Sequence, residues 1–250
     1  LQGTTHILYS GAESSYTGLP SWSTLNIDPK IHRYVHFTSN NTIYGTQFHE
    51  MPNIDVPVIC DMSSDFISRP IDVSKFDIIY AGAQKNAGPS GVTVILIKKS
   101  ISRNFTGADK VPKIMRYQTQ AQKDSMYNTP NTFGIWVVGL VADWVRKYGG
   151  LTAIADRNNE KASLLYQTVA QCPGLELVAD ELARSHMNVT FRGHTPAVEQ
   201  QILEKATAHG IVGIKGHRSV GGLRASIYNA VSLDDVKALC SLLESCTRGQ

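Results

Sequence analysis

A lysine held in a turn of small residues is the feature of this sequence best suited to chemistry. Lys85 lies at the centre of the stretch 79–91, between strand-like apolar runs at 76–80 and 92–97. Its neighbours are mostly glycine, alanine and serine, so the backbone can approach a bulky ligand closely. A lysine in a surface loop is usually just solvated. In a pocket, however, burial lowers the pKa of a lysine and makes the neutral amine available for Schiff-base formation.

An aspartate upstream supplies a second chemical group. Asp61 follows the apolar run 56–60, so we expect it at the C-terminal end of a strand, where ligands of open α/β sheets bind. Pyridoxal phosphate needs a lysine for its aldehyde and a carboxylate that keeps its pyridine nitrogen protonated, so that the ring can accept electrons. Lys85 and Asp61 together therefore predict a pyridoxal phosphate site.

Apolar runs predict the elements that position these two residues. The runs 56–60, 77–80 and 92–97 are continuous rather than alternating, which predicts strands of a sheet buried on both faces. A short strand is expected at 34–37. A long apolar helix is expected over 133–148, with Thr132 as its N-cap and the glycine pair that follows as its end.

The order of elements changes after residue 150. A second helix is expected over 151–170, and it marks the boundary between a large domain, 1–150, and a small α/β domain, 151–250. In the small domain we expect strands at 175–178, 187–191, 211–214 and 224–228, and helices at 196–208 and at 233–243 with Ser232 as cap.

Composition indicates an ordinary globular protein. The 250 residues are 42% apolar and 18% charged, and a net charge of +3 is too weak to argue for nucleic-acid binding. No run is long enough to span a bilayer and the start does not resemble a signal peptide, so we expect a cytoplasmic protein. The four cysteines are irregularly spaced, which predicts reduced, mostly buried thiols, and the histidines show no metal-ligand spacing, so no metal is expected.

Several motifs along essentially the whole chain resemble those of the phosphoserine aminotransferase family. Members of that family are fold-type I enzymes dependent on pyridoxal 5'-phosphate. The motifs lie at 61–64, 68–74, 80–86, 127–130, 215–218 and 221–230. The resemblance implies an α/β fold with a mostly parallel central sheet and a small C-terminal α/β domain. It also implies amino transfer from glutamate to 3-phosphohydroxypyruvate, which gives O-phosphoserine for serine biosynthesis. Lys85 would then hold the cofactor and carry the substrate proton, and Asp61 would face the pyridinium.

The same resemblance implies further contacts to the cofactor. Gln84, beside the lysine, matches the family residue at the cofactor phosphate. Thr42 matches the threonine that hydrogen-bonds the ring hydroxyl, although Asn40 and Asn41 are polar alternatives for that contact.

Other matched residues point to the substrate and to a second subunit. Asn128 and Thr129 resemble the pair that reaches the cofactor phosphate from the neighbouring subunit, which implies a homodimer with shared active sites. Arg224 is the expected partner of the substrate α-carboxylate, because a planar guanidinium matches a carboxylate with two hydrogen bonds. His217 and Arg218 are candidates for the substrate phosphate, again across the dimer.

The resemblance begins part-way along the family's sequence. About the first third of the family pattern, with its Gly-rich turn and its aromatic residue stacked on the ring, has no match here, and the chain starts with Leu1. We therefore expect either a fragment or a natural truncation, with exposed apolar surface and weak cofactor binding on its own. Two alternatives stay open. One is a non-catalytic interaction or regulatory module; the other is an enzyme for an unphosphorylated acid, against which the motif 216–218 speaks.

Overall fold

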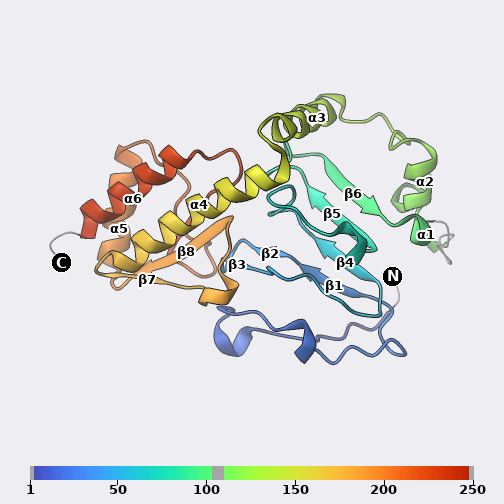
Figure 1. Cartoon of the computed structure of the whole chain (residues 1–250), viewed down its shortest axis with the longest axis horizontal. Helices are drawn as coiled ribbons and strands as arrows, with labels where there is room; N and C mark the ends of the chain where they lie inside the picture. Colours follow the sequence, from blue (N-terminus) through green and yellow to red (C-terminus); the bar gives the residue numbers. More distant parts are fainter. Residues whose placement is uncertain (1–2, 103–109, 248–250) are drawn as a thin grey trace.

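The computed structural model describes residues 3–102 and 110–247 and has two lobes joined by one long helix (Figure 1). We call the part with β1 to β6 the N-terminal lobe and the part with β7 to β9 the C-terminal lobe. The strands are β1 (Val35–Thr38), β2 (Asn40–Asn41), β3 (Thr46–Gln47), β4 (Val58–Asp61), β5 (Ile78–Gly82), β6 (Thr93–Ile97), β7 (Leu175–Leu177), β8 (Asn188–Gly193) and β9 (Leu223–Ser226). The α-helices are α1 (Lys99–Ser102), α2 (Tyr117–Gln122), α3 (Thr132–Lys147), α4 (Gly150–Gln171), α5 (Pro196–Ala208) and α6 (Leu233–Thr247). Short 3-10 turns are η1 (Ala12–Ser14), η2 (Trp22–Thr24), η3 (Val73–Lys75), η5 (Lys113–Met115) and η6 (Glu181–Ala183).

A four-stranded sheet organises the N-terminal lobe. Its order is β1-β4-β5-β6, with parallel pairing of β1 with β4 and of β4 with β5, and antiparallel pairing of β5 with β6. The predicted strands at 34–37, 56–60, 77–80 and 92–97 are thus confirmed, and the sheet is mostly parallel as expected. Its core is a cluster of apolar side chains from β4, β5 and the residues next to these strands, namely Val58, Cys60, Met62, Phe76 and Ile79.

The prediction that this sheet is buried on both faces is wrong for β6. Ile95 and Leu96 are 40% and 43% exposed. The reason is position: β6 pairs only with β5 among the described strands, so it forms an edge of the described sheet. Helix α3 also leaves apolar side chains exposed, with Phe133 at 68% and Trp136 at 59%.

A three-stranded antiparallel sheet, in the order β7-β8-β9, forms the C-terminal lobe together with α4, α5 and α6. Helix α4 packs against both α6 and β7, and its buried side chains Ala162, Leu165 and Val169 belong to one apolar core with Phe191 of β8. This sheet pairs β9, the strand that carries Arg224, with β8, and Arg224 contacts Thr42 of the other lobe.

Two local predictions need correction. The segment 211–214 is not a strand, because Gly210 and Gly213 turn the chain at φ +73° and +77° and leave Val212 exposed; only an isolated bridge joins Lys215 to Leu223. Helix α3 is capped by Asn131 and not by Thr132, since the Asn131 side chain accepts a hydrogen bond from Gly134 N at 3.0 Å.

Other local predictions are confirmed. Helix α5 spans the predicted residues, and Ser232 caps α6 by accepting from Asp235 N at 3.0 Å. All four cysteines are free and buried. Among residues 3–102 and 110–247, no helix combines the length and the apolar character that crossing a membrane requires.

Candidate active site

Lys85 lies in the turn that follows β5 and is half-buried. The turn closes on itself, because Ala87 N and Gly88 N both donate to Ala83 O, at 3.1 and 2.7 Å. Burial lowers the pKa of Lys85 below its usual value; the nearby Asp61 carboxylate opposes this shift and the Arg224 guanidinium adds to it. The three side chains are therefore close enough to interact electrostatically, and the lysine is partly prepared to act as a neutral amine.

Asp61 ends strand β4, as expected, and its carboxylate is held from one side. Its Oδ1 atom accepts hydrogen bonds from Ser63 N at 2.8 Å and from Ser63 Oγ at 2.6 Å. The same Ser63 hydroxyl accepts from Gly82 N at 3.0 Å, at the start of the lysine turn. One serine thus fixes the carboxylate relative to the turn that carries Lys85.

Arg224 of β9 reaches across from the C-terminal lobe. Its Nη1 donates to Thr42 O at 2.9 Å, which joins the two lobes beside the lysine. Its Nε is buried and has no hydrogen-bond partner in the part of the chain that the structure describes. Because a buried donor without an acceptor is costly, this nitrogen is suited to an oxygen of a bound ligand.

The structure separates the three polar candidates at 40–42. Asn40 is buried, and its amide is already used by Ser64, Asn188 and Ser185. Asn41 Oδ1 accepts from two backbone N–H groups of its own turn. The Thr42 hydroxyl and the Asn41 Nδ2 atom have no hydrogen-bond partner among the described residues, so both are available to a ligand. Asn40 is thus occupied by other contacts, whereas Thr42 and Asn41 both stay open as candidates for the contact to the ring hydroxyl.

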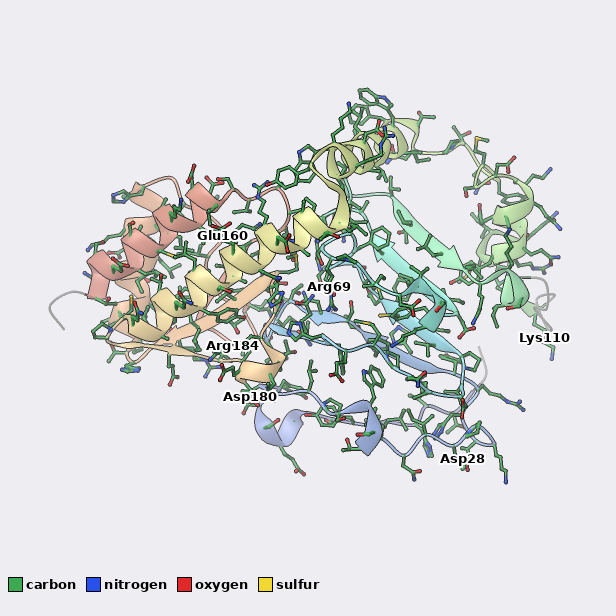
Figure 2. All side chains as sticks on the ribbon, viewed as in Figure 1. Asp28, Arg69, Lys110, Glu160, Asp180 and Arg184 are labelled. Atoms are coloured by element: carbon green, nitrogen blue, oxygen red, sulfur yellow. The ribbon has the colours of Figure 1, made fainter. Side chains whose placement is uncertain are left out.

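The contacts of Asn40 belong to a buried polar junction between the lobes that the sequence did not reveal. Asn188 of β8 bonds Asn40, and its Nδ2 also lies near the Tyr228 hydroxyl at 3.2 Å. At the outer end of this junction the rings of His49 and His186 lie 4.8 Å apart. Arg69 and Arg184, labelled in Figure 2, flank it from the two lobes, and His49 Nε2 donates to Arg184 O at 2.9 Å. No sequence signal marks this junction, because its members are up to 148 positions apart.

The remaining predicted residues are not brought to Lys85 by the described contacts. Gln84 is exposed and its side chain folds over Gly82. His217 contacts Ser219 Oγ at 2.7 Å in its own loop, and Arg218 is exposed. The other two, Asn128 and Thr129, are exposed in the loop between α2 and α3.

The known proteins that this chain resembles agree with this geometry. Residues 13–239 match the model of the aminotransferase class-V family. A curated phosphoserine aminotransferase of Alkalihalobacillus alcalophilus is 48% identical over 97% of this chain and 67% of the relative. The solved phosphoserine aminotransferase of Bacillus circulans subsp. alkalophilus is 42% identical, with a TM-score of 0.94 over 98% of this chain and 68% of that one. The chain belongs to the phosphoserine aminotransferase family.

Members of this aminotransferase family use pyridoxal 5'-phosphate. A phosphoserine aminotransferase of Trichomonas vaginalis, solved with pyridoxal phosphate bound, is 33% identical to this chain with a TM-score of 0.86 over 91% of it and 64% of that chain. The residues present here fit the group: a half-buried lysine with a lowered pKa, a fixed carboxylate and a rim of small residues surround one place. This chain spans about two thirds of the length of the curated aminotransferases that it matches.

Proposed function

We propose that this protein transfers an amino group between glutamate and 3-phosphohydroxypyruvate, giving O-phosphoserine. The observation that carries the proposal is the buried Arg224 Nε, which has no partner among the described residues, on a side chain that reaches Thr42 from the other lobe. Ser63 meanwhile ties the Asp61 carboxylate to the turn of Lys85. Family membership supports the reaction class. When bound, pyridoxal phosphate supplies an electron sink for the electrons released at the substrate Cα.

The residues of this chain would divide the work. Lys85 would hold the cofactor aldehyde, and its amine, once released, would accept the proton from the substrate Cα. Asp61, fixed by Ser63, would keep the ring nitrogen protonated. Arg224 would bind the α-carboxylate, which supplies the missing acceptor for Nε. Thr42 would donate its free hydroxyl to the ring.

A second copy of the chain would complete the site. Gln84 would reach the cofactor phosphate from the same chain as Lys85. Asn128 and Thr129 would reach that phosphate from the partner subunit, and His217 and Arg218 would bind the substrate phosphate across the dimer. The exposed positions of Asn128, Thr129 and Arg218 support this arrangement, since side chains that act on a neighbouring site have no need to face their own.

The first test is the visible absorbance of the purified protein with excess pyridoxal phosphate, followed by glutamate. We expect a band that changes when glutamate is added, and its loss in Lys85→Ala. Lys98→Ala is the matched control, because Lys98 is a largely exposed lysine that pairs with Asp77 at 3.5 Å away from the site. It should leave both signals unchanged.

Three results would contradict this proposal. A band that persists in Lys85→Ala would assign the cofactor to another lysine. No band with excess cofactor, in a protein that still self-associates, would instead favour the non-catalytic interaction module. A glutamate response without any turnover of phosphohydroxypyruvate would favour an unphosphorylated second substrate.

Shared active sites make a separate prediction. Lys85→Ala and the double variant Asn128→Ala/Thr129→Ala should each lose most transaminase activity. Mixed in equal amounts and allowed to exchange subunits, they should recover about a quarter of the unsubstituted activity, because half of the dimers then contain one intact site of two. No recovery after exchange, with hybrid dimers shown by mass spectrometry, would place all these residues in one subunit's site.

A further inference from the structure

Asn229, just beyond β9, joins three segments that carry the proposed site. It is 1% exposed. Its backbone N–H donates to Asn86 Oδ1 at 3.0 Å, its Nδ2 donates to Ile67 O at 3.0 Å, and its Oδ1 accepts from Asn158 Nδ2 at 2.9 Å. Asn86 is the residue next to Lys85, and Ile67 lies in the loop that follows Asp61. One buried side chain and its backbone therefore contact the lysine turn, the aspartate loop and helix α4.

The segment that contains Asn229 is held firmly on its other side. Lys161 of α4 is fully buried and donates to Ile227 O, Tyr228 O and Val231 O at 2.9, 2.8 and 3.0 Å. Such ammonium-to-carbonyl bonds are stronger than neutral ones. Because the segment 227–231 continues directly from β9, a fixed segment also fixes the strand that carries Arg224.

The two lobes do not share one apolar core. The buried cluster of the N-terminal lobe ends at Ile79, and that of the C-terminal lobe begins at Ala162. The separation between Lys85 and Arg224 is therefore set by contacts at the lobe junction rather than by common packing. Asn229 contacts Asn86, the residue next to Lys85, whose Nδ2 also donates to Met187 Sδ at 3.5 Å.

We propose that Asn229 is a positioning residue that sets the separation between the Lys85 amine and the Arg224 guanidinium. This inference rests on the proposed function. An amino acid substrate presents its amine and its carboxylate at a fixed spacing, so both groups engage only if lysine and arginine keep a matching spacing. A misplacement of about 1 Å costs on the order of 100-fold in an oriented reaction.

The test compares Asn229→Ala with Thr247→Val in the whole protein. Thr247 is equally buried and donates to Leu243 O at 3.1 Å inside α6, so its variant deletes a buried hydrogen bond away from the junction. With pyridoxal phosphate bound, we expect both variants to retain the visible band and to lose some thermal stability. Only Asn229→Ala should raise the half-saturating glutamate concentration of the spectral change, by about tenfold or more.

Asn229→Ser provides a second variant, because its hydroxyl can replace one of the two side-chain hydrogen bonds. Its half-saturating glutamate concentration should fall between those of the unsubstituted protein and Asn229→Ala. If the alanine variant does not fold, the serine variant takes its place in the comparison with Thr247→Val. A readout without cofactor is amide hydrogen exchange over 223–231, which should increase in Asn229→Ala more than in Thr247→Val.

The outcomes separate the two proposals. An unsubstituted protein without any glutamate response overturns the proposed function, and this inference with it. A responding protein in which Asn229→Ala and Thr247→Val need the same glutamate concentration overturns the positioning role alone. Equal hydrogen exchange over 223–231 in the two variants would also overturn the positioning role alone.

Discussion

Arg224 has two kinds of nitrogen in this structure, and they have different surroundings. Nη1 is already bonded to Thr42 O, whereas Nε is buried without a partner among the described residues. Lysine at this position could not keep all of these contacts, because its ammonium cannot bond the Thr42 carbonyl and both carboxylate oxygens in the geometry of a planar guanidinium.

Arg224→Lys should therefore weaken glutamate binding without removing the cofactor. The loss of one charge-assisted hydrogen bond predicts a rise of about 10- to 100-fold in the half-saturating glutamate concentration. The visible band with pyridoxal phosphate should remain. Arg146→Lys is a suitable control, since Arg146 is exposed and pairs with Asp143 on the same helix. Unchanged glutamate binding in Arg224→Lys would remove Arg224 from the carboxylate site.

At the residue scale, the sequence predicts groups whose chemistry is local. Lys85 lies in a recognisable turn and Asp61 follows a recognisable strand, so both could be found without coordinates. Lys161 could not, because its acceptors are carbonyl oxygens 66 to 70 positions away, and a lysine in a helix is normally exposed. The role of Asn229 could not be predicted either, because its hydrogen-bond partners lie 71 to 162 positions away.

At the scale of elements, the cap of α3 offers a direct test. Asn131→Ala should lower the free energy of unfolding by about 1 kcal/mol, because Gly134 N loses its side-chain acceptor. Thr132→Ala, one position along, should change it by less than about 0.5 kcal/mol. Chemical denaturation measures both. A larger loss in Thr132→Ala than in Asn131→Ala would restore the sequence-based assignment of Thr132 as the cap.

Elements were predictable where a single rule controlled them. Helix α5 has a Thr195 cap, proline at its first position and glycine after its end, and its predicted bounds are confirmed. The segment 211–214 has an apolar pattern typical of a strand, but two glycines with positive φ control its path. Whether β6 is covered depends on neighbouring elements, which no pattern within 92–97 encodes.

At the scale of the whole molecule, the histidine at the lobe junction should make the stability of the folded protein sensitive to acid. Burial lowers the pKa of His186 from 6.5 to about 4, with His49 and Arg69 adding to the effect. Between these values the unfolded chain binds a proton that the folded protein does not, so stability decreases as the pH falls from about 6.5 towards 4. Allowing for partial exposure, the loss is about 2 kcal/mol.

His186→Gln should remove much of this acid sensitivity, because glutamine does not titrate. Thermal unfolding at pH 7 and at pH 5 measures the difference between the two proteins. His209→Gln is the control, since His209 is exposed at the end of α5, where its ring contacts Lys205 O. Parallel losses in all three proteins would show that other groups cause the sensitivity. The junction itself was beyond sequence analysis, because its hydrogen bonds join residues such as Ser185 and Asn40, 145 positions apart.

Helix α4 makes the molecule mechanically asymmetric. Its 22 residues form one rod about 33 Å long, with Asn158 bonded to the N-terminal lobe and Lys161 to the C-terminal lobe. A rod of this kind transmits rotation but resists stretching. Any opening of the lobes would therefore pivot about α4 and would have to break the hydrogen bond from Arg224 Nη1 to Thr42 O. Spin labels at the two ends of α4 would keep their separation during such a movement, while labels across the opposite edge would move apart.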